Sequence, residues 1–372
     1  GGTLIILNDG ANNSHLFPCS DMWNGIIVEP GGILDIGGTV TSGSKLGTLI
    51  QGAITAIDVN AGTLKLNYAT FDHDLLSVYV RNNPSVNSYI YGCKFRCTGA
   101  RIGKAPFDDY IPFEHVRIEN VSNFQFPIGK TTGGTGLINY FSDAFSAIGV
   151  YKSSVIIQRN NFDDIYNHNS FYHSSSYGQA INVVGSPSTT PLVVDIGGTG
   201  TNEPNYFTNS NIGVRVSNTK SISQLVIAGN EFENTSLQEI GAGTDFCNTA
   251  ITVQNPLSRL ITQEVSVFGN TITDYRIGIH ANNVSAISIG ADVTGGTKNT
   301  INLNKGYSGF MHGIWIENCP QAKIQSNEIT QNGVTYSAEG ITINESADAV
   351  VNLNILKDLS IPSHVFGNCE DT

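Results

Sequence analysis

One short phrase recurs four times along the chain and limits what it can fold into. In each copy a strand-like run reaches an Asn, and a large apolar residue follows two positions later. The copies are IIQRNNF (156–162), VIAGNEF (226–232), SVFGNTI (266–272) and KIQSNEI (323–329). A fixed motif repeated in this way predicts a repeat architecture in which each copy belongs to one structural unit.

A second phrase, a short apolar strand usually entered through a small residue, alternates with the first. Its Ile positions are spaced by 26 to 39 residues: Ile148, Ile181, Ile212, Ile251, Ile277, Ile314 and Ile341. A constant motif at uneven spacing predicts coils of the same cross-section joined by loops of different length.

Together the two phrases predict a β-solenoid. A strand with one apolar row cannot bury that row alone, so it stacks on the matching strand of the next coil, about 4.8 Å away. Asn at a corner tolerates a left-handed backbone, and its amide can bond the same amide one coil away. The predicted structural ladder is Asn160, Asn230, Asn270, Asn327 and Asn368, with Asn205 and Asn299 as further candidates, and Phe162, Phe232, Ile272 and Ile329 stacked in the core.

This repeat resembles the right-handed parallel β-helix, the fold of pectate lyases, polygalacturonases and many bacterial surface proteins. The resemblance implies an all-β chain, with residues 1–372 forming one β-helix of roughly 10–13 coils. The part from 101 to 142 is less regular, and we expect a coil with long loops there. Few charged residues (13%) and only 2 Met agree with this prediction, because helical proteins are rich in Glu, Lys and Leu.

Composition also excludes some partners. The net charge is −12 and the 19 Lys and Arg nowhere cluster, which argues against nucleic-acid binding. No run of 18 apolar residues exists, so we expect no membrane span. The chain opens on Gly1 without Met or a signal sequence, which suggests a processed or excised piece of a longer protein.

The string CSDMWNGIIVEPGGILDIGG (19–38) resembles the opening coils of secreted surface proteins of Bacteroidota, which are exported by type IX secretion. The residues that carry the resemblance are Cys19, Asp21, Met22, Trp23 and Gly25. It implies a secreted or cell-surface protein. Six cysteines in an exported chain leave disulfides open, with a connectivity that the sequence does not choose.

The corner motif changes toward both ends of the chain. Alignment on the apolar position places Ala69 and Cys93 at early corners, with Cys93 pointing inward. The final string HVFGNCEDT (364–372) repeats the motif and stops just after Asn368. Because an uncapped solenoid bares strand edges and core, we expect the natural chain to continue, or self-assembly or a neighbouring domain to cover this end.

Known catalytic strings of this fold do not carry over. The sequence has Asp108-Asp109 and Asp163-Asp164, but not the Asn-Thr-Asp or Arg-Ile-Lys strings of polygalacturonases. The nearest match to their Gly-His-Gly is Met311-His312-Gly313. The Arg-x-Pro-x-x-Arg string of pectate lyases is absent as well.

The best local cluster is FDDIYNHNSFYH (162–173). It offers carboxylates and imidazoles as catalytic candidates (Asp163, Asp164, His168 and His173) and tyrosines for ligand stacking (Tyr166 and Tyr172). Such groups can bind a sugar, coordinate Ca²⁺, or supply the two carboxylates of a glycoside hydrolase. The ordinary alternative is a solvated turn that follows the strand.

Two further positions have both a functional and a structural interpretation. Trp315 falls on the outward side of its strand, where it is either a platform for a sugar or packing under a loop. Asp72 is expected beside Arg96 of the next coil, either as part of a site or as a surface salt bridge.

Three functions remain in view. The missing catalytic strings favour a structural or adhesive extracellular protein, such as a rod, stalk or filament subunit, that contacts glycans. The alternatives are a polysaccharide lyase or glycoside hydrolase and a glycan-binding spike. No cofactor is expected apart from Ca²⁺, and the partners expected are a polysaccharide or further copies of the chain.

Overall fold

The computed structural model describes residues 1–7, 14–37, 39–41, 44–99, 102–129, 137–165, 178–186, 190–200, 203–217, 221–235, 249–255, 264–291, 297–304, 310–332 and 337–366. No α-helix occurs in these ranges, and accordingly no helix in them is long and apolar enough to cross a membrane.

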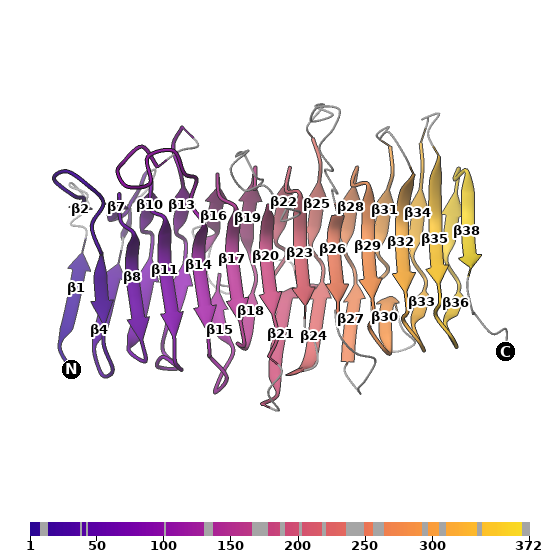
Figure 1. Ribbon diagram of the computed structural model, residues 1–372, viewed down its shortest axis with the longest axis horizontal. Helices are drawn as coiled ribbons and strands as arrows, with labels where there is room; N and C mark the ends of the chain where they lie inside the picture. The colour runs from indigo at the N-terminus through magenta and orange to yellow at the C-terminus, as the bar shows by residue number, and fades with distance from the viewer. Residues whose placement is uncertain are drawn as a thin grey trace. The chain divides into compact units, whose positions relative to one another are not determined.

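The described strands form three parallel sheets of 12 strands each, and successive strands of the chain enter the three sheets in turn (Figure 1). This confirms the predicted all-β fold, a right-handed parallel β-helix with a number of coils inside the expected range.

The strands are short, mostly three to six residues, as expected for the sides of a coil. The first sheet consists of β1 (Thr3–Leu7), β4 (Ile33–Gly37), β9 (Thr63–Asn67), β12 (Tyr89–Tyr91), β15 (Phe126–Ile128), β18 (Val155–Ile157), β21 (Leu192–Gly197), β24 (Ile222–Ala228), β27 (Glu264–Phe268), β30 (Ile287–Gly290), β33 (Lys323–Gln325) and β36 (Val350–Asn352). The second consists of β2 (His15–Leu16), β7 (Leu49–Gln51), β10 (Thr70–Asp72), β13 (Lys94–Arg96), β16 (Asn139–Ser142), β19 (Asn160–Asp163), β22 (Tyr206–Thr208), β25 (Glu231–Glu233), β28 (Thr271–Thr273), β31 (Thr300–Asn302), β34 (Glu328–Thr330) and β37 (Ile355–Lys357). The third consists of β3 (Ile26–Val28), β8 (Thr55–Asn60), β11 (Leu76–Arg81), β14 (Glu114–Glu119), β17 (Ser146–Tyr151), β20 (Gln179–Val184), β23 (Ile212–Ser217), β26 (Thr249–Gln254), β29 (Ile277–Asn282), β32 (Met311–Glu317), β35 (Ala338–Asn344) and β38 (Ile361–Phe366). A separate antiparallel pair is formed by β5 (Thr39–Thr41) and β6 (Ser44–Leu46).

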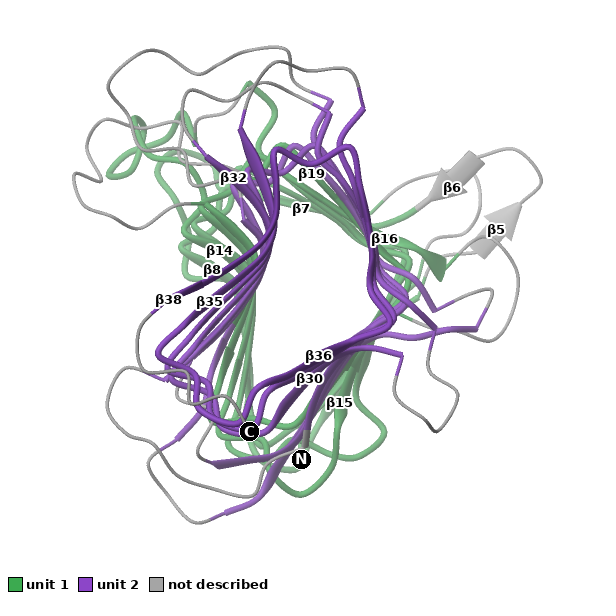
Figure 2. Ribbon diagram, turned by 90° about the vertical axis from the view of Figure 1, so that its right-hand side faces the viewer, with its two compact units in different colours: residues 1–182 green, residues 183–372 purple. Residues whose placement is uncertain are grey.

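Two compact units divide the chain, unit 1 (Gly1–Asn182) and unit 2 (Val183–Thr372), coloured separately in Figure 2. Within each unit the inward side chains of all three sheets form the core, and the outward ones face solvent. The prediction of a single continuous domain stays a prediction.

Unit 1 fills one row of its core with phenylalanines. Phe71, Phe95, Phe141 and Phe162 occupy the same register position on β10, β13, β16 and β19. Their neighbouring ring centroids are 4.7–5.0 Å apart, and all four side chains are buried. Each of these rings therefore stacks on the ring one coil away.

Unit 2 carries a ladder of six buried or part-buried asparagine amides. Neighbouring Nδ2 and Oδ1 atoms are 2.9–3.0 Å apart along the series Asn205, Asn230, Asn270, Asn299, Asn327 and Asn354. The second N–H of Asn230 donates to the carbonyl of Ile196 at 3.0 Å, and the later amides repeat this bond. Hydrogen bonds along the axis of the unit therefore replace the hydrogen bonds to water that each buried amide loses on folding.

At most of these corners a left-handed backbone belongs to the residue before the Asn and not to the Asn itself. Gly229, Gly269 and Ser326 have φ of 65°, 67° and 54°. This corrects the mechanism expected from the sequence: the Asn lies immediately before the next strand, and the residue preceding the Asn makes the turn.

The ladder is shorter in unit 1. Asn139 donates to Asn160 at 2.8 Å, and the amide N–H of Cys93 donates to Asn139 at 2.8 Å. Cys93 and Ala69 are buried at the earlier corners. Among the described cysteines, Cys19, Cys93, Cys97 and Cys319 are unpaired; Cys247, Cys369 and the predicted rung Asn368 lie outside the described residues.

Candidate functional site

The cluster predicted at 162–173 is described only in part. Asp163 is exposed at the end of β19, and Asp164 follows in a turn with φ of 52°. Partial burial and the neighbouring carboxylates raise the pKa of Asp163. His168, His173, Tyr166 and Tyr172 lie outside the described residues.

Trp315 lies in unit 2, on the outer face of the third sheet. In the parallel register it follows His280 of β29 and precedes Thr342 of β35. The side chains around it come from four neighbouring strands and are named here the His–Trp face: His280, Asn282, His312, Trp315, Glu317, Glu339, Thr342 and His364. Of these residues, the sequence patterns described above single out only Trp315 and His312.

Two imidazole rings pack against the indole. The ring centroid of Trp315 lies 5.0 Å from that of His280 and 4.8 Å from that of His312. The contact with His280 follows from the register, because side chains at one position of successive coils stack along the axis. The predicted sugar platform is thus partly covered by the protein's own rings.

The two carboxylates of the face both have partners within the protein. Glu339 accepts a hydrogen bond from the hydroxyl of Thr342 at 2.6 Å and lies 3.3 Å from both His312 and His364. Glu317 lies 3.5 Å from His280. The close contact with His280 lowers the pKa of Glu317, so this carboxylate is ionised at neutral pH.

His312 is held in one orientation. Its Nδ1 lies 3.0 Å from the hydroxyl oxygen of Thr342, which donates its own proton to Glu339. Nδ1 of His312 therefore carries the proton in the neutral ring, and Nε2 is the other nitrogen. Burial lowers the pKa of His312 and outweighs the opposing effect of Glu339.

Three buried polar atoms of the face make no hydrogen bond in the described structure: Trp315 Nε1, His280 Nε2 and Asn282 Oδ1. A buried polar group without a partner costs about 1–3 kcal/mol. Such atoms are rare in native proteins, and a ligand or ordered water is a common explanation. They make the His–Trp face the leading candidate site of the described residues.

Unit 1 has a comparable cluster on the outer face of the same sheet, named here the Tyr–Arg–Glu network: Asp58, Tyr79, Arg81, Glu114, Arg117, Glu119 and Tyr151. Its charged groups contact one another, although two buried atoms, Glu114 Oε2 and Arg117 Nε, make ionic contacts and no hydrogen bond. Arg81 bonds Asp58 through two nitrogens at 3.0 Å, Tyr79 donates to Glu119 at 2.6 Å, and the Arg117 guanidinium lies 4.5 Å from the Tyr151 ring centre.

Glu114 is the buried member of this network. Its Oε1 accepts a hydrogen bond from Tyr151 at 2.5 Å, and its Oε2 lies 3.9 Å from Arg117. It occupies space left free by Gly149, where a Cβ would come within 2.3 Å of Oε1. Burial raises the pKa of Glu114 to about 7, despite Tyr151 and Arg117.

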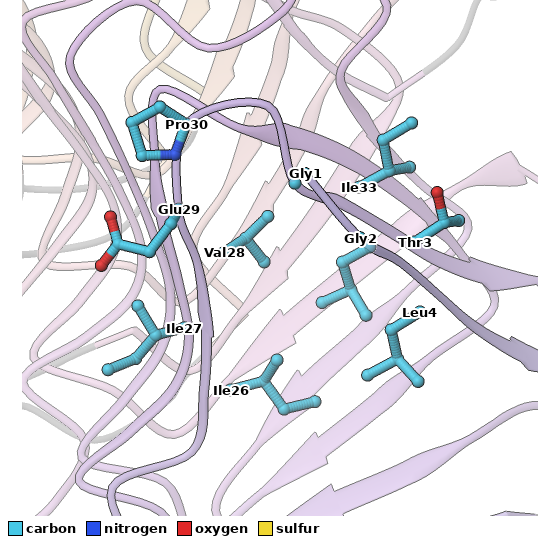
Figure 3. A pocket seen from close by; sticks show the side chains of 12 residues that line it. Gly1, Gly2, Thr3, Leu4, Ile26, Ile27, Val28, Glu29, Pro30 and Ile33 are labelled. Carbon is cyan, nitrogen blue, oxygen red and sulfur yellow. The ribbon is translucent and has the colours of Figure 1, made fainter.

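An open cavity of about 370 Å³ lies elsewhere in unit 1, beside β1, β3 and β4. Val28, Ile26 and Leu4 are among its apolar lining residues, and Glu29 is the only charged side chain in that lining (Figure 3). It offers apolar surface and no group of polar side chains, so its chemistry indicates no reaction.

No three His, Cys, Asp or Glu of the described residues are arranged to hold a metal ion. Comparisons with protein families, curated proteins and solved structures find no match to this chain. The functional argument therefore depends on the site itself.

Proposed function

We propose that this protein is an extracellular or cell-surface β-helical protein with a structural or adhesive role, as a rod, stalk or filament subunit, and that it contacts glycans through the His–Trp face. The fold supports the structural role, because each coil adds rigid length at about 4.8 Å. It does not by itself specify a ligand.

The observation that carries the glycan contact is the set of unpaired polar atoms beside a partly exposed indole. Sugar-binding sites combine an aromatic ring, for the apolar face of a pyranose, with a few fixed hydrogen-bonding groups. Trp315 supplies the ring and an N–H, while Asn282 and His280 supply polar atoms on the preceding strand. The partial cover by His280 and His312 favours contact with the edge of the indole.

The extracellular location is part of the proposal and depends on the resemblance of residues 19–38 to type IX-secreted proteins of Bacteroidota. Two of the residues that carry this resemblance, Met22 and Trp23, have structural contacts. Met22 is buried with Cys97 and Ile102, and the indole of Trp23 donates to the carbonyl of Gln51 at 3.1 Å.

A glycan array and a polysaccharide-digestion screen, each with and without Ca²⁺, test the function. We expect wild-type protein to bind a glycan without degrading it, Trp315→Ala to lose binding, and Tyr206→Ala to retain it. Tyr206 is the control because it is an exposed aromatic residue on the second sheet of the same unit. Absence of binding contradicts the proposal, and release of unsaturated or reducing products replaces it with an enzymatic one.

A further inference from the structure

The unpaired atoms of the His–Trp face form a complementary set. Trp315 Nε1 can only donate a hydrogen bond. Asn282 Nδ2 donates to Glu317 Oε2 at 2.9 Å, and this carboxylate contact fixes the orientation of the amide. Asn282 Oδ1 is therefore an unpaired acceptor, on the strand next to the unpaired donor.

The two carboxylates of the face already have partners within the protein, so the site does not require a charged ligand. Glu317 is paired with Asn282 and His280, and Glu339 is paired with Thr342 and two imidazoles. Apart from His280 Nε2, which lies 3.5 Å from Glu317, what is left is one uncharged donor and one uncharged acceptor. They lie on adjacent strands, with Asn282 diagonal to Trp315 because its register partner is Glu317.

We infer that the His–Trp face recognises the acetamido group of an N-acetylated amino sugar, an inference that rests on the glycan binding proposed above. The acetamido carbonyl would accept from the indole N–H of Trp315, and the acetamido N–H would donate to Oδ1 of Asn282. The methyl group would pack against the aromatic rings. A planar trans amide presents its carbonyl and its N–H on opposite sides, which suits partners on neighbouring strands.

This ligand class agrees with the electrostatics of the chain. A net charge of −12 repels a polyuronate, whereas an acetamido group carries no charge. It also agrees with how buried polar groups select ligands. A sugar with a hydroxyl in place of the acetamido group leaves at least one of the two atoms unpaired, and a site built this way rejects it.

The His280 ring is the side chain that must turn to admit the group. It packs against the indole, and its Nε2 makes no hydrogen bond, with Glu317 at 3.5 Å as its ionic contact. Rotation of one partly exposed imidazole costs little, because it breaks no well-formed hydrogen bond.

Isothermal titration with matched sugars tests the inference. The first pair is chitohexaose and cellohexaose, which differ at each sugar by acetamido against hydroxyl; the second is N-acetylgalactosamine and galactose. We expect at least one acetylated sugar to bind ten-fold or more tightly than its hydroxyl partner. Trp315→Phe keeps an aromatic ring and removes the donor, so it should weaken the acetylated sugar about ten-fold and leave the hydroxyl sugar unchanged. Tyr206→Phe is the control and should change neither.

The outcomes separate the two proposals. Equal or tighter binding of the hydroxyl sugars in both pairs, or an unchanged affinity of Trp315→Phe, overturns the acetamido inference and leaves glycan binding in place. Failure of every glycan on the array removes the proposed function as well. Tighter binding of an N-acetylated peptide amide than of chitohexaose also overturns the inference, because it assigns the face to a peptide.

Discussion

The outer faces of the third sheet in unit 1 and unit 2 are built from the same kind of parallel strands. They differ in how their polar side chains are paired. In unit 1, Arg117 joins Glu114 and Glu119, and both carboxylates accept tyrosine hydroxyl protons. In unit 2, paired carboxylates surround an indole N–H and an amide oxygen that have no partner. Two buried atoms of the unit 1 face, Glu114 Oε2 and Arg117 Nε, also make no hydrogen bond, but each has an ionic contact, at 3.9 Å and 3.3 Å. Trp315 Nε1 and Asn282 Oδ1 have neither kind of partner, and such groups are suited to an external ligand.

The largest difference between the faces should appear in the pH dependence of stability. Glu114 has a pKa of about 7 in the folded unit and an ordinary value of 4.5 when exposed. The folded state thus keeps a proton that the unfolded state loses, so this residue's contribution is complete below pH 4.5 and is lost as pH rises through 7. The loss should be about 3 kcal/mol.

Urea unfolding at pH 5 and pH 8 measures this effect in a Trp315→Phe background. Trp23 is then the only tryptophan and reports unit 1. Glu114→Gln should remove most of the pH dependence, and the exposed Glu29→Gln should retain it. A wild-type protein equally stable at both pH values contradicts the account of Glu114.

Gly149→Ala should destabilise unit 1 by about 2 kcal/mol, the usual cost of overpacking. The added methyl would meet the Glu114 carboxylate and the Tyr151 ring, at 2.3 Å and 2.8 Å. Gly37→Ala is the matched control, since its nearest neighbour would be Leu7 at 3.7 Å. Equal denaturation midpoints for the two variants would show that Glu114 does not fill that space.

Removing one polar group from each face should have unequal effects on stability. Tyr151→Phe loses a hydrogen bond to Glu114 and should cost about 1–2 kcal/mol. Trp315→Phe loses an N–H that bonds nothing, and should cost less than about 1 kcal/mol beyond the smaller ring. Thermal unfolding of both variants compares them, and a larger loss for Trp315→Phe reverses the assignment of the two faces.

The smallest effect is expected for the exposed edge of the Tyr–Arg–Glu network. Arg81→Gln breaks the two-nitrogen contact with Asp58, which is partly exposed and screened by salt. Its cost should be at most about 1 kcal/mol and should shrink in 1 M NaCl. A salt-independent loss of several kcal/mol would place this pair in the core of the network.

The fold could be predicted from the sequence because the corner motif is local. An Asn and an apolar residue two positions later identify a coil without knowledge of any other coil. The same signal is present in Asn139-Tyr140-Phe141 and Asn354-Ile355-Leu356, which extend the ladder beyond the predicted rungs.

The His–Trp face was not predicted from the sequence, because its residues come from different coils and form no local motif. His280, Trp315, Thr342 and His364 meet through the register of four coils, and loops of unequal length separate them in the chain. The Ile series of the sequence motif uses Ile277, whereas the register partner of Ile314 is Ile279, and this shift of two residues hides the position of His280 opposite Trp315. Asp72 and Arg96 could be paired in advance because both directly follow the aligned Phe71 and Phe95; they bond at 3.1 Å, and Asp72 is buried more deeply than a surface pair.

The two tryptophans allow the most direct test of the difference between paired and unpaired groups. Trp23 Nε1 donates to the carbonyl of Gln51, whereas Trp315 Nε1 has no partner. In an NMR spectrum of ¹⁵N-tryptophan-labelled protein each gives one indole N–H signal. We predict that chitohexaose shifts the Trp315 signal downfield and slows its exchange with water, while the Trp23 signal stays in place. Signals that both remain unmoved at saturating sugar, or a Trp315 N–H already protected from exchange in the free protein, would contradict the account.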